Sequence, residues 1–188
     1  MMKAWILVTL LGLAYGLPQI MGLLKPERFG EALKKFPRSD LWGNILMPLG
    51  TVWFLWNLKR DTVADFATFK PIMFIGFSII GFGTCVFVRD FLAVRGLAVV
   101  ALLVAHVVLM SIQWLDTQWR LIVTAWCYLS IIAAIWITVS PWRLRDYIGW
   151  MTATGNRIRT GSMVRLGFGL AVAVIGMTAI RAAELVQP

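Results

Sequence analysis

Charged side chains are scarce in this chain of 188 residues, since only 14% are Asp, Glu, Lys or Arg while 60% are hydrophobic. Soluble domains carry about 25% charged residues, and a soluble fold of this size could not bury so much apolar surface. Lipid is the solvent that fits the composition. Because helices satisfy their own backbone hydrogen bonds in lipid, the sequence predicts an all-α, polytopic integral membrane helix bundle.

Residues that usually carry catalysis or bind metals are few. The chain has one histidine, His106, and two cysteines, Cys85 and Cys127, which lie inside apolar runs without metal-ligand spacing. It contains no HExxH, no GxSxG and no phosphate-binding glycine loop, and the interiors of its apolar runs have no Asp or Glu. We therefore predict no catalytic residues and no metal site, and the pattern argues against an enzyme.

Six apolar runs of about 18 residues or more predict six transmembrane helices in a single transmembrane domain of residues 1–188. The runs cover residues 4–24, 41–58, 71–88, 91–115, 119–140 and 163–180. Gly12 and Gly16 form a GxxxG pair in the first run, and Gly167, Gly169 and Ala173 mark the last, which indicates close helix packing. Pro18 is expected to kink the first helix.

The excess of basic residues bears on the binding partners of the protein and on its orientation in the membrane. The net charge is +9, and the basic residues lie between apolar runs, as at the cytoplasmic flanks of membrane spans; no nucleic acid is expected. The loops after the first, third and fifth runs hold most of them: Lys25, Arg28, Lys34, Lys35, Arg38, Arg89, Arg95, Arg143, Arg145, Arg157, Arg159 and Arg165. The protein is therefore predicted in a plasma membrane of the bacterial inner-membrane type, with both termini outside and the odd-numbered loops cytoplasmic.

Two of these loops carry apolar residues at helical spacing. Phe29, Leu33 and Phe36 recur in residues 27–36, and Tyr147, Ile148 and Met151 recur in residues 143–151. A proline precedes each segment, as is common at the first turn of a helix. We expect two amphipathic helices lying in the inner interface.

Arg89, Asp90 and Arg95 form a charged elbow between the third and fourth runs, and Arg143 and Arg145 follow the fifth. These five residues are candidates for binding an anion or an anionic lipid headgroup, with Asp90 paired to an arginine. The alternative for the elbow is a plain cytoplasmic turn whose arginines extend to the headgroups.

His106 lies well inside an apolar run. It is a candidate cofactor-binding residue, since a single histidine can ligate one tetrapyrrole metal or relay a proton. The alternative is a neutral imidazole hydrogen-bonded to a neighbouring helix. No other cofactor is indicated.

These features predict a small membrane protein that acts as a structural or accessory subunit, in contact with the lipid bilayer, anionic headgroups and other membrane subunits or further copies of itself. One alternative is a channel or transporter for a small solute or anion. The other is a lipid-binding or lipid-modifying protein working at the basic face.

Overall fold

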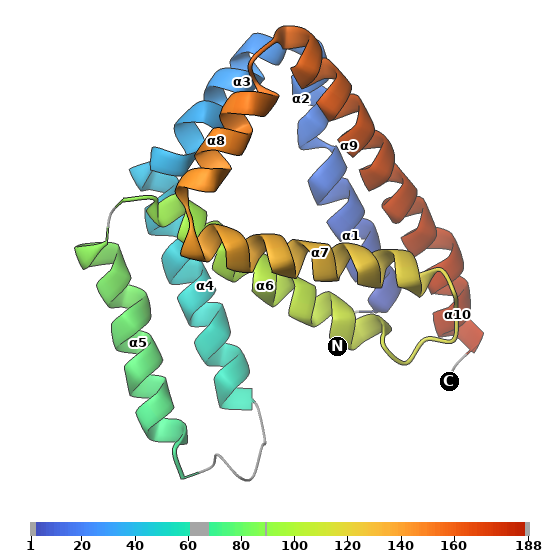
Figure 1. Ribbon diagram of the computed structural model, residues 1–188. Coiled ribbons are helices and arrows are strands. Elements are labelled where there is room, and N and C mark those ends of the chain that lie inside the picture. The colour runs from blue at the N-terminus through green and yellow to red at the C-terminus, as the bar shows by residue number, and fades with distance from the viewer. Residues whose placement is uncertain (1–2, 61–67, 89, 187–188) are drawn as a thin grey trace. The chain divides into compact units, whose positions relative to one another are not determined.

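The computed structural model describes residues 3–60, 68–88 and 90–186, and every regular element in these ranges is a helix (Figure 1). The predicted all-helical architecture is confirmed. Five helical segments are long and apolar enough to cross a membrane: Ala4–Leu24, Lys70–Phe87, Leu92–Ile112, Arg120–Val139 and Gly155–Val186. These apolar helices are compatible with a membrane protein.

The sixth predicted span, at residues 41–58, corresponds to α4 (Asp40–Arg60). This helix has 21 residues but is not among the segments apolar enough to cross a membrane. The reason is its polar content, since it starts at Asp40, ends at Lys59 and Arg60, and contains Asn44 and Asn57. The prediction of six spans is therefore not confirmed by length and hydropathy.

The chain divides into two compact units, and each one combines segments that are distant in sequence. The first unit contains Met1–Lys34, Ala105–Ile131 and Asp146–Pro188. The second unit contains Lys35–Val104 and Ile132–Arg145. The helices α6 (Leu92–Ile112) and α7 (Arg120–Val139) contribute to both units.

The first unit is built on α1 (Ala4–Gly16) and α9 (Gly155–Ile175), which run side by side in opposite directions (Figure 1). Glycines make this approach possible, because a Cβ on Gly12 would lie 2.6 Å from both Ala173 N and Gly169 O. Gly16 faces Gly169 in the same crossing. The close packing predicted from the GxxxG pair is thus confirmed, and its partner is the last long helix of the same chain.

The first helical run is interrupted where the proline was expected to disturb it. α1 ends at Gly16 and α2 (Pro18–Leu24) begins at Pro18. At the other end of α9, a π-helical stretch, η3 (Gly176–Ile180), leads into α10 (Arg181–Val186). Gly176 packs against Thr9 of α1, where a Cβ would lie 2.8 Å from the Thr9 nitrogen. The backbone amide of Trp5 donates to Glu184 Oε2 at 3.2 Å, which joins the two ends of the chain.

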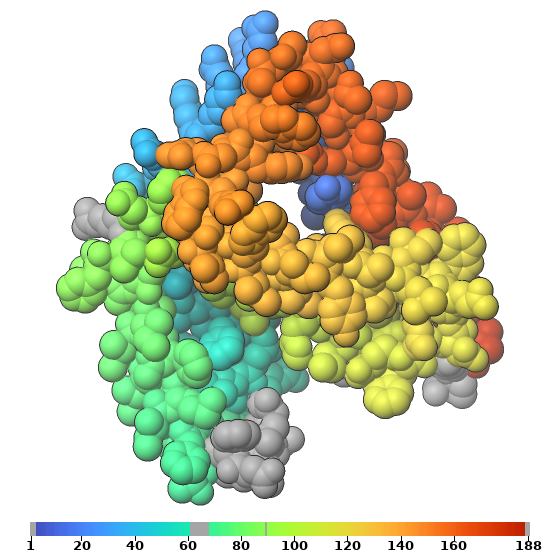
Figure 2. All heavy atoms as spheres, in the orientation of Figure 1, coloured from blue at the N-terminus to red at the C-terminus, as the bar shows by residue number. Residues whose placement is uncertain are grey.

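The second unit holds α4 and α5 (Lys70–Phe87) side by side (Figure 1). Thr51 of α4 packs directly on Gly81 of α5, and the rings of Phe54 and Phe77 meet at 4.8 Å. α4 also crosses the first half of α6, where a Cβ on Gly96 would lie 2.8 Å from Met47 N. Gly81 is the one buried residue of α5, and the side chains of this helix form much of the visible surface of its unit (Figure 2).

Both short amphipathic segments are helices, namely α3 (Pro26–Lys35) and α8 (Trp142–Met151). Some of their apolar residues are buried against other helices of the same unit. Phe29 is buried beside Gly22 and Ser162, and Gly30 packs on Ile158. The Phe29 ring therefore packs inside the first unit, and the placement of the two helices in the membrane interface stays a prediction.

Candidate anionic headgroup site

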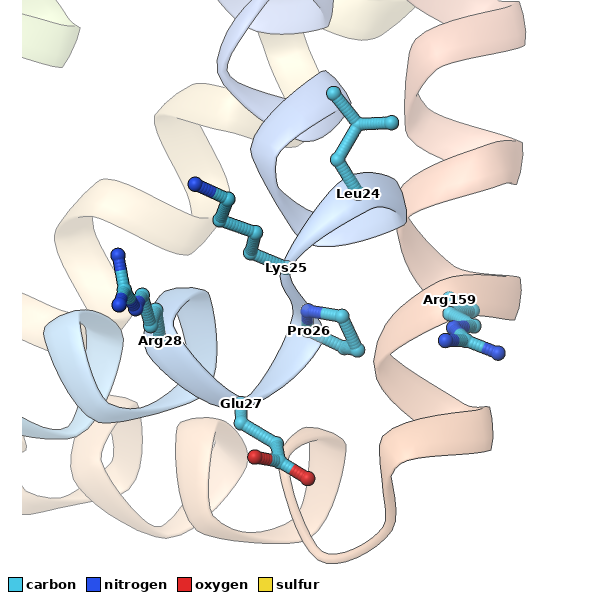
Figure 3. Close-up of a pocket in the computed structure, with 6 residues that line it drawn as sticks. All are labelled: Leu24, Lys25, Pro26, Glu27, Arg28 and Arg159. Atoms are coloured by element: carbon cyan, nitrogen blue, oxygen red, sulfur yellow. The ribbon is translucent and has the colours of Figure 1, made fainter.

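A basic pocket opens where α2 meets α3 beside the first turns of α9 (Figure 3). Its volume is about 380 Å³, and its lining residues are Leu24, Lys25, Pro26, Glu27, Arg28 and Arg159. Lys25 and Arg28 extend on one side of Pro26, and Arg159 projects from α9 on the other side (Figure 3). All six residues belong to the first unit.

The local sequence explains the shape of this junction. A residue that precedes proline is disfavoured in the helical region, and Lys25 has φ −136° and ψ 69°, so the chain turns there. Proline then suits the first turn of the next helix, and α3 starts at Pro26. The Phe29 amide donates to the Lys25 carbonyl at 3.1 Å, which fixes the first turn of α3 against the bend.

Packing against α9 holds the pocket in place. A Cβ on Gly22 would lie 3.0 Å from the Ser162 Cβ and from a ring carbon of Phe29. Such close approach leaves α2 little freedom to move away from α9. Arg159 is therefore kept near the α2–α3 bend by contacts that do not involve its own charge.

The charges of the pocket favour a negatively charged ligand. Lys25, Arg28 and Arg159 bring three cations, and Glu27 is the one carboxylate of the lining. Guanidinium groups bind phosphate through paired N–H donors, and the lysine ammonium adds a compact charge. Glu27 sits in the first turn of α3, where it complements the helix dipole, and its carboxylate points away from the three cationic groups (Figure 3).

Several arginines of the basic segments lie over aromatic rings. Arg157 is 5.6 Å from the Trp150 ring centre in the first unit, and Arg143 is 5.2 Å from the Trp136 ring centre in the second. Stacking of this kind orients a guanidinium while its N–H edge stays available to an oxyanion. These pairs are typical of side chains placed between an apolar surface and charged headgroups.

The five arginine and aspartate candidates from the sequence do not line this pocket. Asp90 is exposed, Arg95 is half-buried in α6, and Arg89 lies outside the described residues. Within the described part of the chain no ion pair joins Asp90 to Arg95, and Arg95 Nε is buried with no hydrogen-bond partner. Arg143 and Arg145 are exposed on α8. Their role in binding lipid or anions stays a prediction.

His106 is exposed on α6, and Met110, one turn further, is 48% exposed. No hydrogen bond to this imidazole occurs among the described residues, so the neighbouring-helix bond that would explain a packed histidine is not formed there. Its role as a cofactor ligand stays a prediction. In the described ranges, no three His, Cys, Asp or Glu side chains come together as a metal site.

Sequence reasoning counted Lys25, Arg28 and Arg159 only as loop charges. The local signal that could have singled out the first two is a lysine before proline at the end of an apolar run, with an arginine one turn later. Arg159 lies more than 130 positions away, so only the packing of α2 on α9 brings it to the same pocket.

No known protein family, curated protein or solved structure matches this chain.

Proposed function

We propose that this protein is a non-enzymatic integral membrane protein that binds the phosphate of an anionic phospholipid at the cytoplasmic face. The observation that carries the proposal is the pocket with three cations and one carboxylate at the end of an apolar helical run. Juxtamembrane basic clusters attract anionic lipids, and Leu24 provides an apolar edge on which the first part of an acyl chain can rest. The ligand is held by its charge and is not transformed.

The arrangement of the first unit supports six crossings, with α4 included. Leu24 lines a pocket with Arg159, which supports placing the end of α2 and the start of α9 on one side of the membrane. Trp119 lines an apolar groove of about 700 Å³ with Ala182, which supports placing the start of α7 on the other side. This proposed placement requires an odd number of crossings between Leu24 and Trp119. Since α5 and α6 are both apolar enough to cross, we propose α4 as the third crossing.

Cysteine labelling tests this topology. Single-cysteine variants at Ser39 and Thr117, made after Cys85 and Cys127 are replaced by serine, are expected to react from opposite sides of intact cells. Thr117 should react with an impermeant maleimide added outside, and Ser39 only after the membrane is opened. Labelling of both positions from one side would mean that α4 does not cross, and that the orientation predicted from the basic residues fails.

Charge removal inside the pocket tests lipid binding. Lys25→Gln combined with Arg28→Gln is expected to weaken phosphatidylglycerol binding about tenfold or more, because at least one charge-assisted contact is lost. Native mass spectrometry of the full chain, titrated with phosphatidylglycerol and with phosphatidylcholine, measures this change.

The matched control is Lys34→Gln with Arg38→Gln, which removes the same charge from residues outside the pocket. If both double variants lose affinity equally, the effect comes from general surface charge and the pocket is not the binding site. A preference for phosphatidylglycerol that survives only in the control supports the proposal.

A second candidate function is that of an accessory subunit, with which the surface of α5 is compatible. Large apolar side chains along this helix are exposed, among them Ile72, Ile75, Ile79 and Ile80, and a partner helix could cover them in place of lipid. The hydroxyls of α5 do not favour a channel, because Ser78 and Thr84 donate to carbonyls of their own helix, Phe74 and Ile80. Transport of a small solute or anion is therefore the weaker alternative.

A further inference from the structure

Arg165, inside the apolar helix α9, is surrounded by neutral partners. Its Nη2 donates to the Tyr147 hydroxyl at 3.0 Å and also contacts Met151 Sδ. The Tyr15 ring centre is 6.3 Å from the ring centre of Phe168, which lies about one turn along α9 from Arg165. Within the described part of the chain no carboxylate pairs with Arg165, so its charge is not neutralised by the residues around it. Ionisable groups in membrane spans are costly when unpaired and usually have an oppositely charged partner.

Arg165 lies in the middle of α9 (Gly155–Ile175), and its guanidinium is directed toward the start of the helix, the end that carries Arg159 of the basic pocket. Its Nη1 is 3.7 Å from the position that a Cβ on Gly161 would occupy, so the side chain folds back along α9 toward its start. The next residue, Ser162, packs on Gly22, two positions before Leu24 of the basic pocket. Because Gly161 has no side chain, the space beside it is open to the Arg165 guanidinium.

The groups that converge here are donors. An arginine has five N–H donors and no acceptor. The Tyr147 oxygen accepts from Arg165, so its own proton can be donated elsewhere, and the Tyr15 hydroxyl can donate as well. A ligand that completes this arrangement must accept several hydrogen bonds and carry negative charge, as a phosphate oxygen does.

Aromatic rings form the apolar side of this cluster. Tyr15 and Trp126 lie with ring centres 5.0 Å apart, and Trp126 and Phe168 with ring centres 5.1 Å apart, both edge to face. Apolar rings provide a surrounding of low dielectric constant, in which a guanidinium attracts an anion more strongly than in water. A ligand with a charged head and an apolar body fits such a boundary better than a fully polar ion.

We propose that Arg165, Tyr15 and Tyr147 form a second phosphate site, which binds the headgroup of an inner-leaflet phospholipid on a face of α9 different from the basic pocket. Arg159 and Arg165 are six positions apart, which corresponds to about a third of a turn around the helix. The two arginines therefore point to different sides of α9. The choice of a lipid as ligand rests on the proposed function, whereas the requirement for an oxyanion follows from the donors alone.

The test counts the phospholipids that the full chain retains. Native mass spectrometry after reconstitution in phosphatidylglycerol and phosphatidylcholine is expected to show two tightly retained phosphatidylglycerol molecules per chain. Arg165→Gln should lose one of them, and the Lys25→Gln and Arg28→Gln double variant should lose the other. Tyr147→Phe removes only a hydroxyl on an exposed residue, so it should fold normally and weaken retention of one lipid about tenfold.

Arg181→Gln is the matched control, because Arg181 also belongs to the last helical segment but lies 5.2 Å from the Trp5 ring at the opposite end of the unit. Unchanged retention in both Arg165→Gln and Tyr147→Phe would overturn the second site. Full displacement of the retained lipid by millimolar inorganic phosphate would show that the site takes free phosphate. If Arg165→Gln loses a co-purified protein but keeps both lipids, a carboxylate of a partner protein fills the site. Either result overturns the lipid assignment. If Arg165→Gln loses one phosphatidylglycerol molecule and the Lys25→Gln and Arg28→Gln double variant retains both, the second site is supported and the basic pocket is rejected as a binding site.

Discussion

Replacing Gly169 by leucine is expected to break the packing of α1 on α9 and to prevent the first unit from folding normally. A Cβ at this position would lie 2.7 Å from Gly12 O and 2.8 Å from the nitrogen and Cα of Gly16. These obstructing atoms are backbone, so no rotamer change can relieve the clash. We expect a loss of about 3 kcal/mol or more in the free energy of unfolding, measured in mixed micelles with an increasing fraction of denaturing detergent.

Gly167→Leu is the control for this substitution. Gly167 lies on the same helix two positions earlier, and a Cβ there meets nothing within 4 Å. The same change in hydrophobicity and helix propensity should therefore leave stability within about 1 kcal/mol of the wild type. Equal losses in the two variants would mean that α1 does not pack on α9 at this glycine.

The second large effect is expected at the contact between α4 and α5. Gly81→Ala places a methyl group against the Thr51 side chain, since the Thr51 Cβ lies 2.9 Å from the position of the new atom. Thr51 is buried, and its hydroxyl donates to the Met47 carbonyl at 2.8 Å, which restricts its rotation. We expect a loss of about 1–3 kcal/mol, seen as a lower midpoint in the same detergent titration.

A double-mutant cycle separates this contact from a general effect of alanine. Because the obstacle at Gly81 is a side chain, Thr51→Ala should recover most of the stability that Gly81→Ala loses. Gly76→Ala in α5 has nothing within 4 Å of its new Cβ and should be neutral or slightly stabilising. If Thr51→Ala gives no recovery, the two helices do not meet at Thr51 and Gly81.

Different residues of α9 serve the fold and the proposed binding sites. Ser162 and Gly169 face α2 and α1 and hold the helix in place, whereas Arg159 and Arg165 carry the charges that we propose bind phosphate. Substitutions at the arginines should therefore change lipid retention with little change in unfolding, and substitutions at the glycines should do the reverse. This separation makes the lipid experiments interpretable.

The all-helical class could be predicted from the sequence alone. Long apolar runs with few charges favour helices, and this preference is local, so helices occur at each of the six apolar runs. The break at Pro18 and the starts of α3 at Pro26 and α8 near Pro141 are also local, because proline restricts its own backbone and that of the preceding residue. The close approach at Gly12 and Gly16 could be predicted as well, since glycine spacing on one helix face is visible in one segment.

The partners of these segments were decided only by the tertiary structure. Gly12 needs a facing glycine, and nothing in its own helix identifies Gly169 more than 150 positions later. The apolar run in α4 predicted a span from the sequence, but the helix is less apolar than the five segments that are apolar enough to cross, and its crossing stays a proposal. Arg159 lines one pocket with Lys25 and Arg28 only because α2 packs on α9. In the sequence Arg165 was counted as a loop charge, and only the fold places it beside Tyr147. Charge and hydropathy act over a few residues of sequence, whereas a binding site requires donors from several helices, and their convergence depends on how those helices pack.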